Sequence, residues 1–101
     1  MSRPNVVMIV LDTVRARNLS CYGYDRETTP NLESMDLVRF ENAFAPANAT
    51  VPSHASLFTG SYRSIHQTTF DNKILNPDLA TLAERLSGAG YRTLGLSNNI
   101  H

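Results

Sequence analysis

The sequence has little of what marks several classes of protein. Cys21 is the single cysteine in 101 residues, which excludes an internal disulfide framework and fits a reducing compartment. Acidic and basic residues balance to a formal net charge of zero, so no broad basic surface for nucleic acid or acidic lipid is expected. The apolar run over residues 6–11 is too short for a membrane helix or the core of a signal peptide. These absences predict a cytoplasmic chain with no nucleic-acid partner and no membrane segment.

The N-terminal stretch predicts a strand that ends at a carboxylate. Residues 5–11 read Asn-Val-Val-Met-Ile-Val-Leu, a run typical of a strand buried on both faces of a parallel sheet. Asp12 follows at once, and ligands of open α/β sheets bind beyond the carboxyl ends of strands. A carboxylate at this place is a candidate ligand for a hard divalent cation. A turn or helix-capping role explains the same position, so both interpretations stay open.

A second informative stretch is Thr-Val-Pro-Ser-His-Ala-Ser-Leu-Phe-Thr-Gly at residues 50–60. Pro52 suits the first position of a helix, which we expect to run over about residues 53–58 and to stop at Gly60. Thr50 would then stand at the helix N-terminus, where free N–H groups and the positive dipole end attract an anion. A nucleophilic hydroxyl at such a place could attack a phosphate or sulfate ester.

The remaining patterns predict an α/β chain of at most one small domain. Thr29 as cap and Pro30 as first residue predict a helix start. Alternation over residues 38–44 predicts a half-exposed strand, and residues 91–97 predict another. Asn76-Pro77-Asp78 predicts the start of a further helix that ends by Gly88. With the strand at residues 91–97 this helix would complete a β–α–β unit with a right-handed crossover. The core-facing stripe expected on that helix is Leu79, Leu82, Ala83 and Leu86.

Residues 50–60 resemble the nucleophile segment of the sulfatase family, within the alkaline phosphatase superfamily. Thr50 stands at the nucleophile position, where sulfatases have Cys or Ser, and His54 stands at the arginine position. A threonine and a histidine at these two positions are more similar to the pattern of the nucleotide pyrophosphatase/phosphodiesterases. Residues 10–16 resemble the first metal-ligand motif of sulfatases, with Thr13 where many members have a second Asp. Residues 19–24 look like the family's Cys-Tyr-Gly segment, in which Cys21 is interpreted as a packed residue.

The resemblance implies a fold and an incomplete domain. The implied fold is the N-terminal portion of an alkaline-phosphatase-like, mostly parallel sheet flanked by helices. Enzymes of this family are several hundred residues long and gather metal ligands from both halves. Residues 1–101 are therefore interpreted as the N-terminal fragment of a sulfatase-like catalytic domain, with the remainder of that domain as partner.

The resemblance also implies a mechanism. Asp12 and Thr50 would hold a divalent cation (Ca, Mg, Mn or Zn), and the activated Thr50 hydroxyl would attack the ester. His54 would contact the leaving group or the bound anion, or pack beneath the site. The substrate would be a small-molecule or glycan sulfate ester; a phosphate ester is the alternative, with a phosphodiesterase of the same superfamily as its enzyme. An inactive fragment or binding remnant that lacks the later metal ligands is a third interpretation.

Two departures bear on cofactors and on the end of the chain. Sulfatases normally oxidise their nucleophile to formylglycine, and Thr50 cannot form that aldehyde because its β-carbon carries a methyl group, so no formylglycine is expected. His66 stands at the place of a family histidine and is interpreted as structural or loop-lining.

Residues 97–101 stand where the family has a Gly-Lys-x-His segment. Asn98 replaces the lysine and His101 is displaced by one position, so neither receives a catalytic role.

Overall fold

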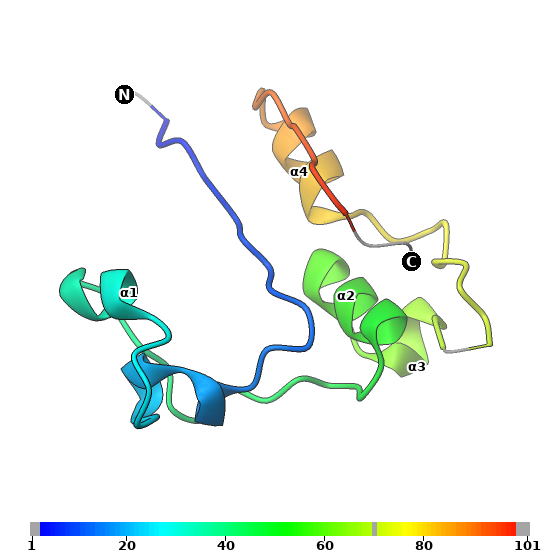
Figure 1. The fold of residues 1–101 in the computed structure, drawn as a ribbon. Coiled ribbons are helices and arrows are strands. Elements are labelled where there is room, and N and C mark those ends of the chain that lie inside the picture. Colours follow the sequence, from blue (N-terminus) through cyan, green and yellow to red (C-terminus); the bar gives the residue numbers. More distant parts are fainter. Residues whose placement is uncertain (1–2, 70, 99–101) are drawn as a thin grey trace. The chain divides into compact units, whose positions relative to one another are not determined.

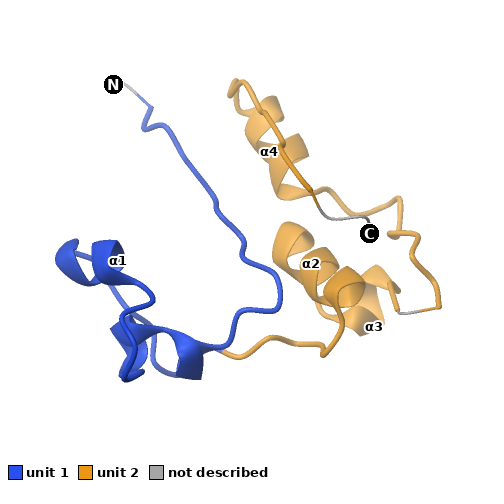
Figure 2. Ribbon diagram, in the orientation of Figure 1, with its two compact units in different colours: residues 1–43 blue, residues 44–101 orange. Residues whose placement is uncertain are grey.

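The computed structural model describes residues 3–69 and 71–98 and divides the chain into two compact units, Met1–Ala43 and Phe44–His101 (Figures 1 and 2). Unit 1, the first of these, has two short 3-10 helices and one α-helix among its described residues: η1 (Ala16–Asn18), η2 (Ser20–Tyr22) and α1 (Pro30–Ser34). Unit 2, the second, contains α2 (Thr50–Thr59), α3 (Arg63–His66) and α4 (Leu82–Gly88). None of the helices in the described residues has the length and apolarity that a membrane crossing requires.

Side-chain hydroxyl groups join η2 to α1 within unit 1. The Cys21 N–H donates to Thr29 Oγ1 at 2.9 Å, and the Thr29 N–H donates to Ser20 Oγ at 2.9 Å. Ser20 Oγ also donates to a carboxylate oxygen of Glu33 at 2.9 Å. The predicted helix start is confirmed, with Pro30 as the first residue of α1 and Thr29 at the N-cap. The Thr29 side chain makes no capping bond to α1, because its hydroxyl is used to bind η2 instead.

Arg39 fastens the segment after α1 to η2. Its guanidinium donates to the Cys21 backbone carbonyl, forms an ion pair with Glu41 at 2.8 Å, and lies 5.5 Å from the centre of the Tyr22 ring. The Tyr22 hydroxyl donates to the Phe40 carbonyl oxygen at 2.8 Å. Exposed ion pairs contribute only about 0–1 kcal/mol. The network therefore orders this segment locally and supplies no apolar core.

Helix α2 ends as predicted but begins earlier. Gly60 has φ 69°, in the left-handed region, and its N–H donates to Ser56 O at 2.8 Å, which confirms the predicted stop signal. The expected start after Pro52 is wrong, because α2 begins at Thr50 and Pro52 is its third residue. Proline fits there because the N–H groups of the first turn have no partner within the helix.

The predicted start of the last helix is also wrong. Asn76 closes a turn instead, with its side-chain oxygen accepting the Asp78 N–H at 3.0 Å. Helix α4 begins only at Leu82, after Thr81. Thr81 Oγ1 accepts the Glu84 N–H at 3.3 Å, while the Glu84 carboxylate accepts the Thr81 N–H at 3.4 Å. This reciprocal capping box satisfies two donors at once and sets the helix start.

The three segments predicted as strands, residues 5–11, 38–44 and 91–97, form no strand in the part of the chain that the structure describes. A strand requires a neighbour whose N–H and C=O groups complete its hydrogen-bond ladder. An isolated extended segment gains nothing that offsets its ordering cost. The α/β sheet therefore stays a prediction for a domain that contains further strands.

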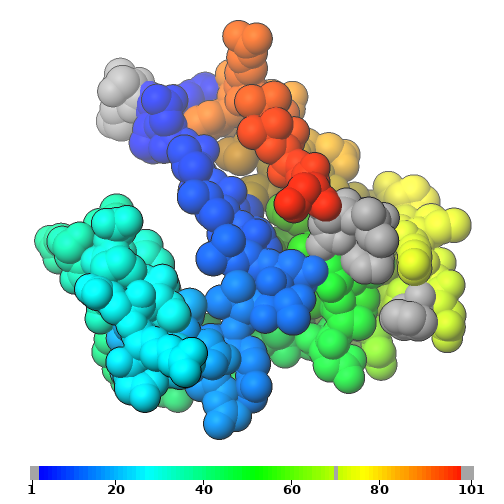
Figure 3. All heavy atoms as spheres, viewed as in Figure 1, coloured from blue at the N-terminus to red at the C-terminus, as the bar shows by residue number. Residues whose placement is uncertain are grey.

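Large apolar side chains are mainly exposed, and none of those described is buried. In the N-terminal segment, coloured dark blue in Figure 3, Val7 is 83% exposed and Ile9 is 78% exposed. The stripe predicted to face the core through α4 is not buried either: Leu82 is exposed and Leu86 is half-buried. The described residues thus include apolar side chains of the kind that form a core, but no other part of the described chain covers them.

We predict that the isolated 101-residue chain is poorly folded or self-associating, because exposed apolar segments and open backbone edges favour association. Size-exclusion chromatography with light scattering should show species larger than a monomer and no cooperative melt. Val7→Lys combined with Ile9→Lys should reduce the association, since charge on this segment opposes edge pairing. A monomer with a sharp cooperative melt would contradict the prediction.

Candidate functional site

Thr50 is the first residue of α2, after Ala49, an N-cap with extended backbone (φ −125°, ψ 152°). The helical ladder starts with the Ser53 N–H, which donates to Ala49 O at 3.1 Å. Pro52 has no N–H, so the N–H groups that precede this ladder are those of Thr50 and Val51, at the positive end of the helix dipole. The residue that the sequence marks as a nucleophile therefore stands, half-buried, at an end of a helix that favours negative charge.

His54 lies one turn further along α2 and contacts Phe58. The centres of the two rings are 6.1 Å apart, and the rings meet edge to face at 79°. His54 is half-buried and Phe58 is 40% exposed, so this contact covers part of the helix surface. Such i, i+4 ring pairs stabilise a helix modestly. Packing along α2 is therefore an observed role of His54, and any contact with a substrate would be additional to it.

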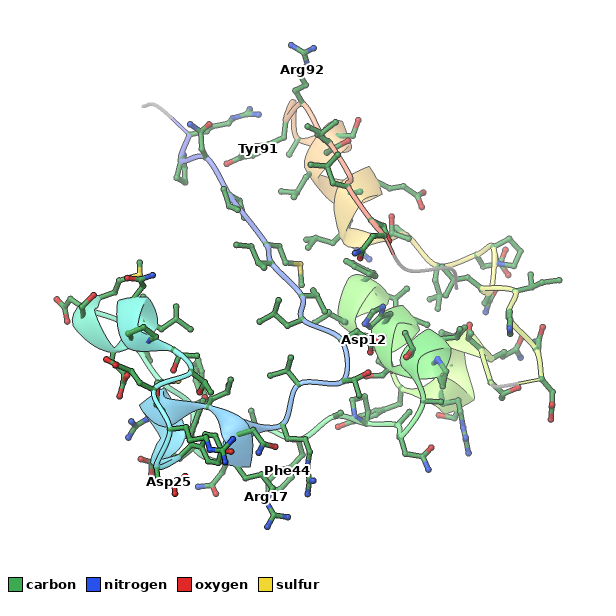
Figure 4. The ribbon with its side chains drawn as sticks, viewed as in Figure 1. Asp12, Arg17, Asp25, Phe44, Tyr91 and Arg92 are labelled. Atoms are coloured by element: carbon green, nitrogen blue, oxygen red, sulfur yellow. The ribbon has the colours of Figure 1, made fainter. Side chains whose placement is uncertain are left out.

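Asp12 lies at a turn in unit 1, directly after the apolar segment of residues 6–11 (Figure 4). Its side chain is exposed. Thr13 has φ 61°, a left-handed conformation that costs a β-branched residue about 1–2 kcal/mol. Strained backbone of this kind persists where the surroundings enforce it, and it often marks functional sites. The turn places the carboxylate of Asp12 at the bend of the chain.

Asp12 belongs to unit 1 and Thr50 to unit 2. No group of three or more His, Cys, Asp or Glu side chains in the described ranges is arranged to hold a metal ion. The joint binding of one cation by Asp12 and Thr50 therefore stays a prediction. Asn98 is exposed, and His101 lies outside the described residues.

Sequence reasoning missed a buried polar cluster between α2 and α3, which contact each other within unit 2 (Figure 1). Ser56 Oγ and His66 Nε2 are 2.9 Å apart, and the Thr68 N–H donates to His66 Nδ1 at 3.0 Å. His66 is 0% exposed, Thr68 is 1% exposed and Ser56 is 9% exposed. Full burial agrees with the interpretation of His66 as a structural residue.

The loop that follows α3 is bonded to the same histidine. Asn76 donates its backbone N–H to His66 O at 3.1 Å and its side-chain amide to Ile65 O at 3.3 Å. Gln67, between His66 and Thr68, has φ 62°. This left-handed residue lets the Thr68 N–H turn back toward the imidazole ring. No sequence pattern links Ser56 to His66 across ten residues, because the contact depends on the turn between the two helices.

Comparison with known proteins places the chain in a family. The sequence profile of the sulfatase family, described as Sulfatase, matches residues 4–100. The N-acetylglucosamine-6-O-sulfatase of Bacteroides thetaiotaomicron is 31% identical over 93 residues, and the match covers 90% of this chain and 17% of that protein. Human arylsulfatase A is 31% identical over 107 residues, covering 97% of this chain and 21% of that protein. Human arylsulfatase H is 35% identical over 114 residues, covering 99% and 20%.

The profile match covers nearly the whole sequence, so the chain belongs to the sulfatase family. It spans between 17% and 21% of the length of these relatives. No solved structure matches it. The family assignment therefore rests on the sequence, and the resemblance seen in residues 50–60 is confirmed at the level of the family.

Proposed function

We propose that this chain is the N-terminal part of the catalytic domain of a metal-dependent sulfate-ester hydrolase with Thr50 as its nucleophile. Membership of the sulfatase family supports the reaction class, since the relatives carry the names of sulfatases. The observation that carries the proposal is the place of Thr50, at the first position of α2. A hydroxyl at a helix N-terminus lies where an ester anion is favourably held.

The donor set suits a hard cation. Asp12 offers carboxylate oxygens and Thr50 a hydroxyl oxygen, the ligand type that Mg²⁺, Ca²⁺ and Mn²⁺ prefer and that Zn²⁺ accepts. Two such residues are too few for a complete site, so the remaining ligands would come from the rest of the domain. A bound cation would lower the pKa of the hydroxyl and neutralise charge on the ester.

The reaction follows from the residues of α2. The Thr50 oxygen attacks the sulfur of the ester and gives its proton to water, while the bond between sulfur and the alcohol oxygen breaks and the departing alkoxide takes up a proton from water. The positive end of the α2 dipole, with the backbone N–H of Val51, stabilises the negative charge of the sulfuryl group. His54, one turn along the helix, is the candidate to contact the departing alcohol or the anion. Water then cleaves the sulfate ester formed on Thr50, because no formylglycine is available to expel sulfate.

A phosphodiesterase of the same superfamily is the alternative function. Thr50 itself favours it, because a methyl group on the β-carbon prevents the aldehyde on which sulfatases normally depend. An alkoxide nucleophile of this kind suits phosphoryl transfer, in which charge stabilisation and positioning do most of the catalysis. Sulfate monoesters remain the first choice because of the family, and small-molecule or glycan esters fit either branch.

An inactive remnant that binds an ester without cleaving it is the non-enzymatic alternative. Too few carboxylate, imidazole or thiol groups gather in the described residues to complete a metal site. A remnant would keep the helix N-terminus for anion binding and lose turnover. Activity measurements on the protein that carries this chain separate the two cases.

In the complete protein, Asp12→Ala should abolish hydrolysis and lower the bound metal, because it removes the carboxylate at the turn after residues 6–11. The control is Asp25→Ala, another exposed carboxylate of unit 1, which should keep both properties. Elemental analysis and turnover of p-nitrophenyl sulfate measure the two effects. Full activity with unchanged metal content would remove Asp12 from the site.

His54→Phe separates the two roles of His54, because an aromatic ring at this position keeps the contact with Phe58 and removes both nitrogen atoms. We expect a loss of kcat of about 10²-fold, in the range of acid–base catalysis, with an unchanged melting temperature. Phe58→Ala, the control, should reduce stability and keep kcat. Equal kcat for His54→Phe and the parent protein would leave His54 with packing alone.

Thr50→Ala should lose turnover and keep the fold, since a single hydroxyl at a helix start contributes only about 1 kcal/mol to stability. Thr50→Ser should keep part of the activity because the attacking oxygen is retained. Thr59→Ala, at the other end of α2, is the matched control and should stay active. Turnover of p-nitrophenyl sulfate and of bis-p-nitrophenyl phosphate measures both branches. An active Thr50→Ala protein would disprove the nucleophile assignment.

Thr50→Cys tests the cofactor. We expect no conversion to formylglycine while His54 occupies the arginine position of the sulfatase segment, and peptide mass spectrometry would detect the aldehyde. Mass spectrometry of the parent protein after substrate exposure also separates the branches. A phosphate retained on Thr50 would favour phosphoryl transfer, whereas turnover of the sulfate ester alone would favour the sulfatase branch.

A further inference from the structure

His66 is the only buried titratable side chain in the part of the chain that the structure describes. It lies at the last position of α3 and contacts Ser56, six residues along α2 from Thr50. The mechanism proposed above does not use it. A fully buried imidazole that makes two hydrogen bonds is an unusual way to join two short helices, since apolar contacts normally do so.

The hydrogen bonds of His66 define the tautomer of its imidazole ring. Nδ1 accepts a hydrogen bond from the Thr68 N–H, so Nδ1 itself carries no proton and the neutral imidazole carries its proton on Nε2. Nε2 therefore donates to Ser56 Oγ at 2.9 Å. This direction excludes a Ser–His catalytic pair, because a general base would need an unprotonated Nε2 to accept the proton of the hydroxyl. His66 thus holds Ser56 and does not activate it.

We propose that His66 is a positioning residue, which sets the place of Thr50 by fixing α2 through Ser56. This inference rests on the proposed function, because it takes Thr50 as the nucleophile. Because the hydrogen bonds of a helix hold its residues in fixed geometry, a bond to Ser56 restricts translation and rotation at the helix start. Misplacement of a reacting group by about 1 Å can cost 10²-fold in rate, which makes such a restriction consequential.

Two substitutions separate the two bonds of the ring. His66→Asn places an oxygen near the position of Nδ1, where it can still accept the Thr68 N–H, and loses the donor to Ser56. His66→Gln places an amide N–H near the position of Nε2, where it can still donate to Ser56, and loses the acceptor for Thr68. The proposal requires the second variant to be the more active one.

The test measures kcat and KM of the complete protein with p-nitrophenyl sulfate, and separately the melting temperature. His66→Asn and Ser56→Ala should each lower kcat by about 10- to 100-fold with KM changed less than about threefold. His66→Gln should recover kcat to within about threefold of the parent protein. The double variant Ser56→Ala/His66→Asn should be no slower than either single variant, because both remove the same bond.

Parental kcat in Ser56→Ala, or equal kcat in the Asn and Gln variants of His66, would overturn the proposal even if stability falls. Ser56→Ala retains His66 and keeps the test decisive if a His66 variant does not fold. The proposed function fails separately, through an active Thr50→Ala protein. An inactive Thr50→Ala together with parental kcat in Ser56→Ala would refute the positioning role alone.

Discussion

The hydrogen bonds of His66 are the interaction on which the structure of unit 2 depends. No large apolar side chain is buried in the described part of that unit, so the contact between α2 and α3 centres on polar groups. The ring bonds to Ser56 on one side and to Thr68 on the other, while the His66 carbonyl accepts from Asn76. Loss of one partner would leave a buried polar group unsatisfied, at a cost of about 1–3 kcal/mol.

In unit 1 the ordered part is held by hydrogen bonds of hydroxyl and guanidinium groups, and not by a buried histidine. Its hydroxyl and guanidinium bonds order the turns around η2, yet its N-terminal apolar segment stays exposed. Residues 6–11 have the composition of a doubly buried strand, and burial of such side chains is the main driving force of folding. The polar side chains around η2 thus find partners within this unit, whereas the apolar side chains of residues 6–11 are left uncovered by the described residues.

Local signals were readable from the sequence, and contacts between elements were not. Pro30 after Thr29 and the stop at Gly60 act within a few residues, and the structure confirms both. Asn76 failed as a helix start because Thr81, with Glu84 three residues later, forms the stronger cap. The family was also readable, since residues 50–60 carry its pattern and the family profile matches residues 4–100.

The candidate site likewise has features that local sequence signals predict and features that depend on contacts between elements. The sequence predicted that Thr50 stands at a helix start, because the signal is local, and the place of His54 one turn later follows from helix geometry. The bond between Ser56 and His66 could not be predicted, because it depends on how the chain turns between α2 and α3. The predicted sheet and the proposed metal site would need partners far apart in the sequence, and such partners cannot be read from a local pattern.

Ser56 makes two contacts that together fix the distance and angle between itself and Thr50 in this chain. Its carbonyl oxygen closes the helix by accepting the Gly60 N–H, and its hydroxyl meets His66. Six residues therefore separate the helix start from the fixed point of the helix, about 9 Å along the axis. One residue inserted between them would turn Thr50 by roughly 100° about that axis. In this chain a substitution along this stretch of α2 keeps the angle between Thr50 and Ser56, whereas an insertion changes it.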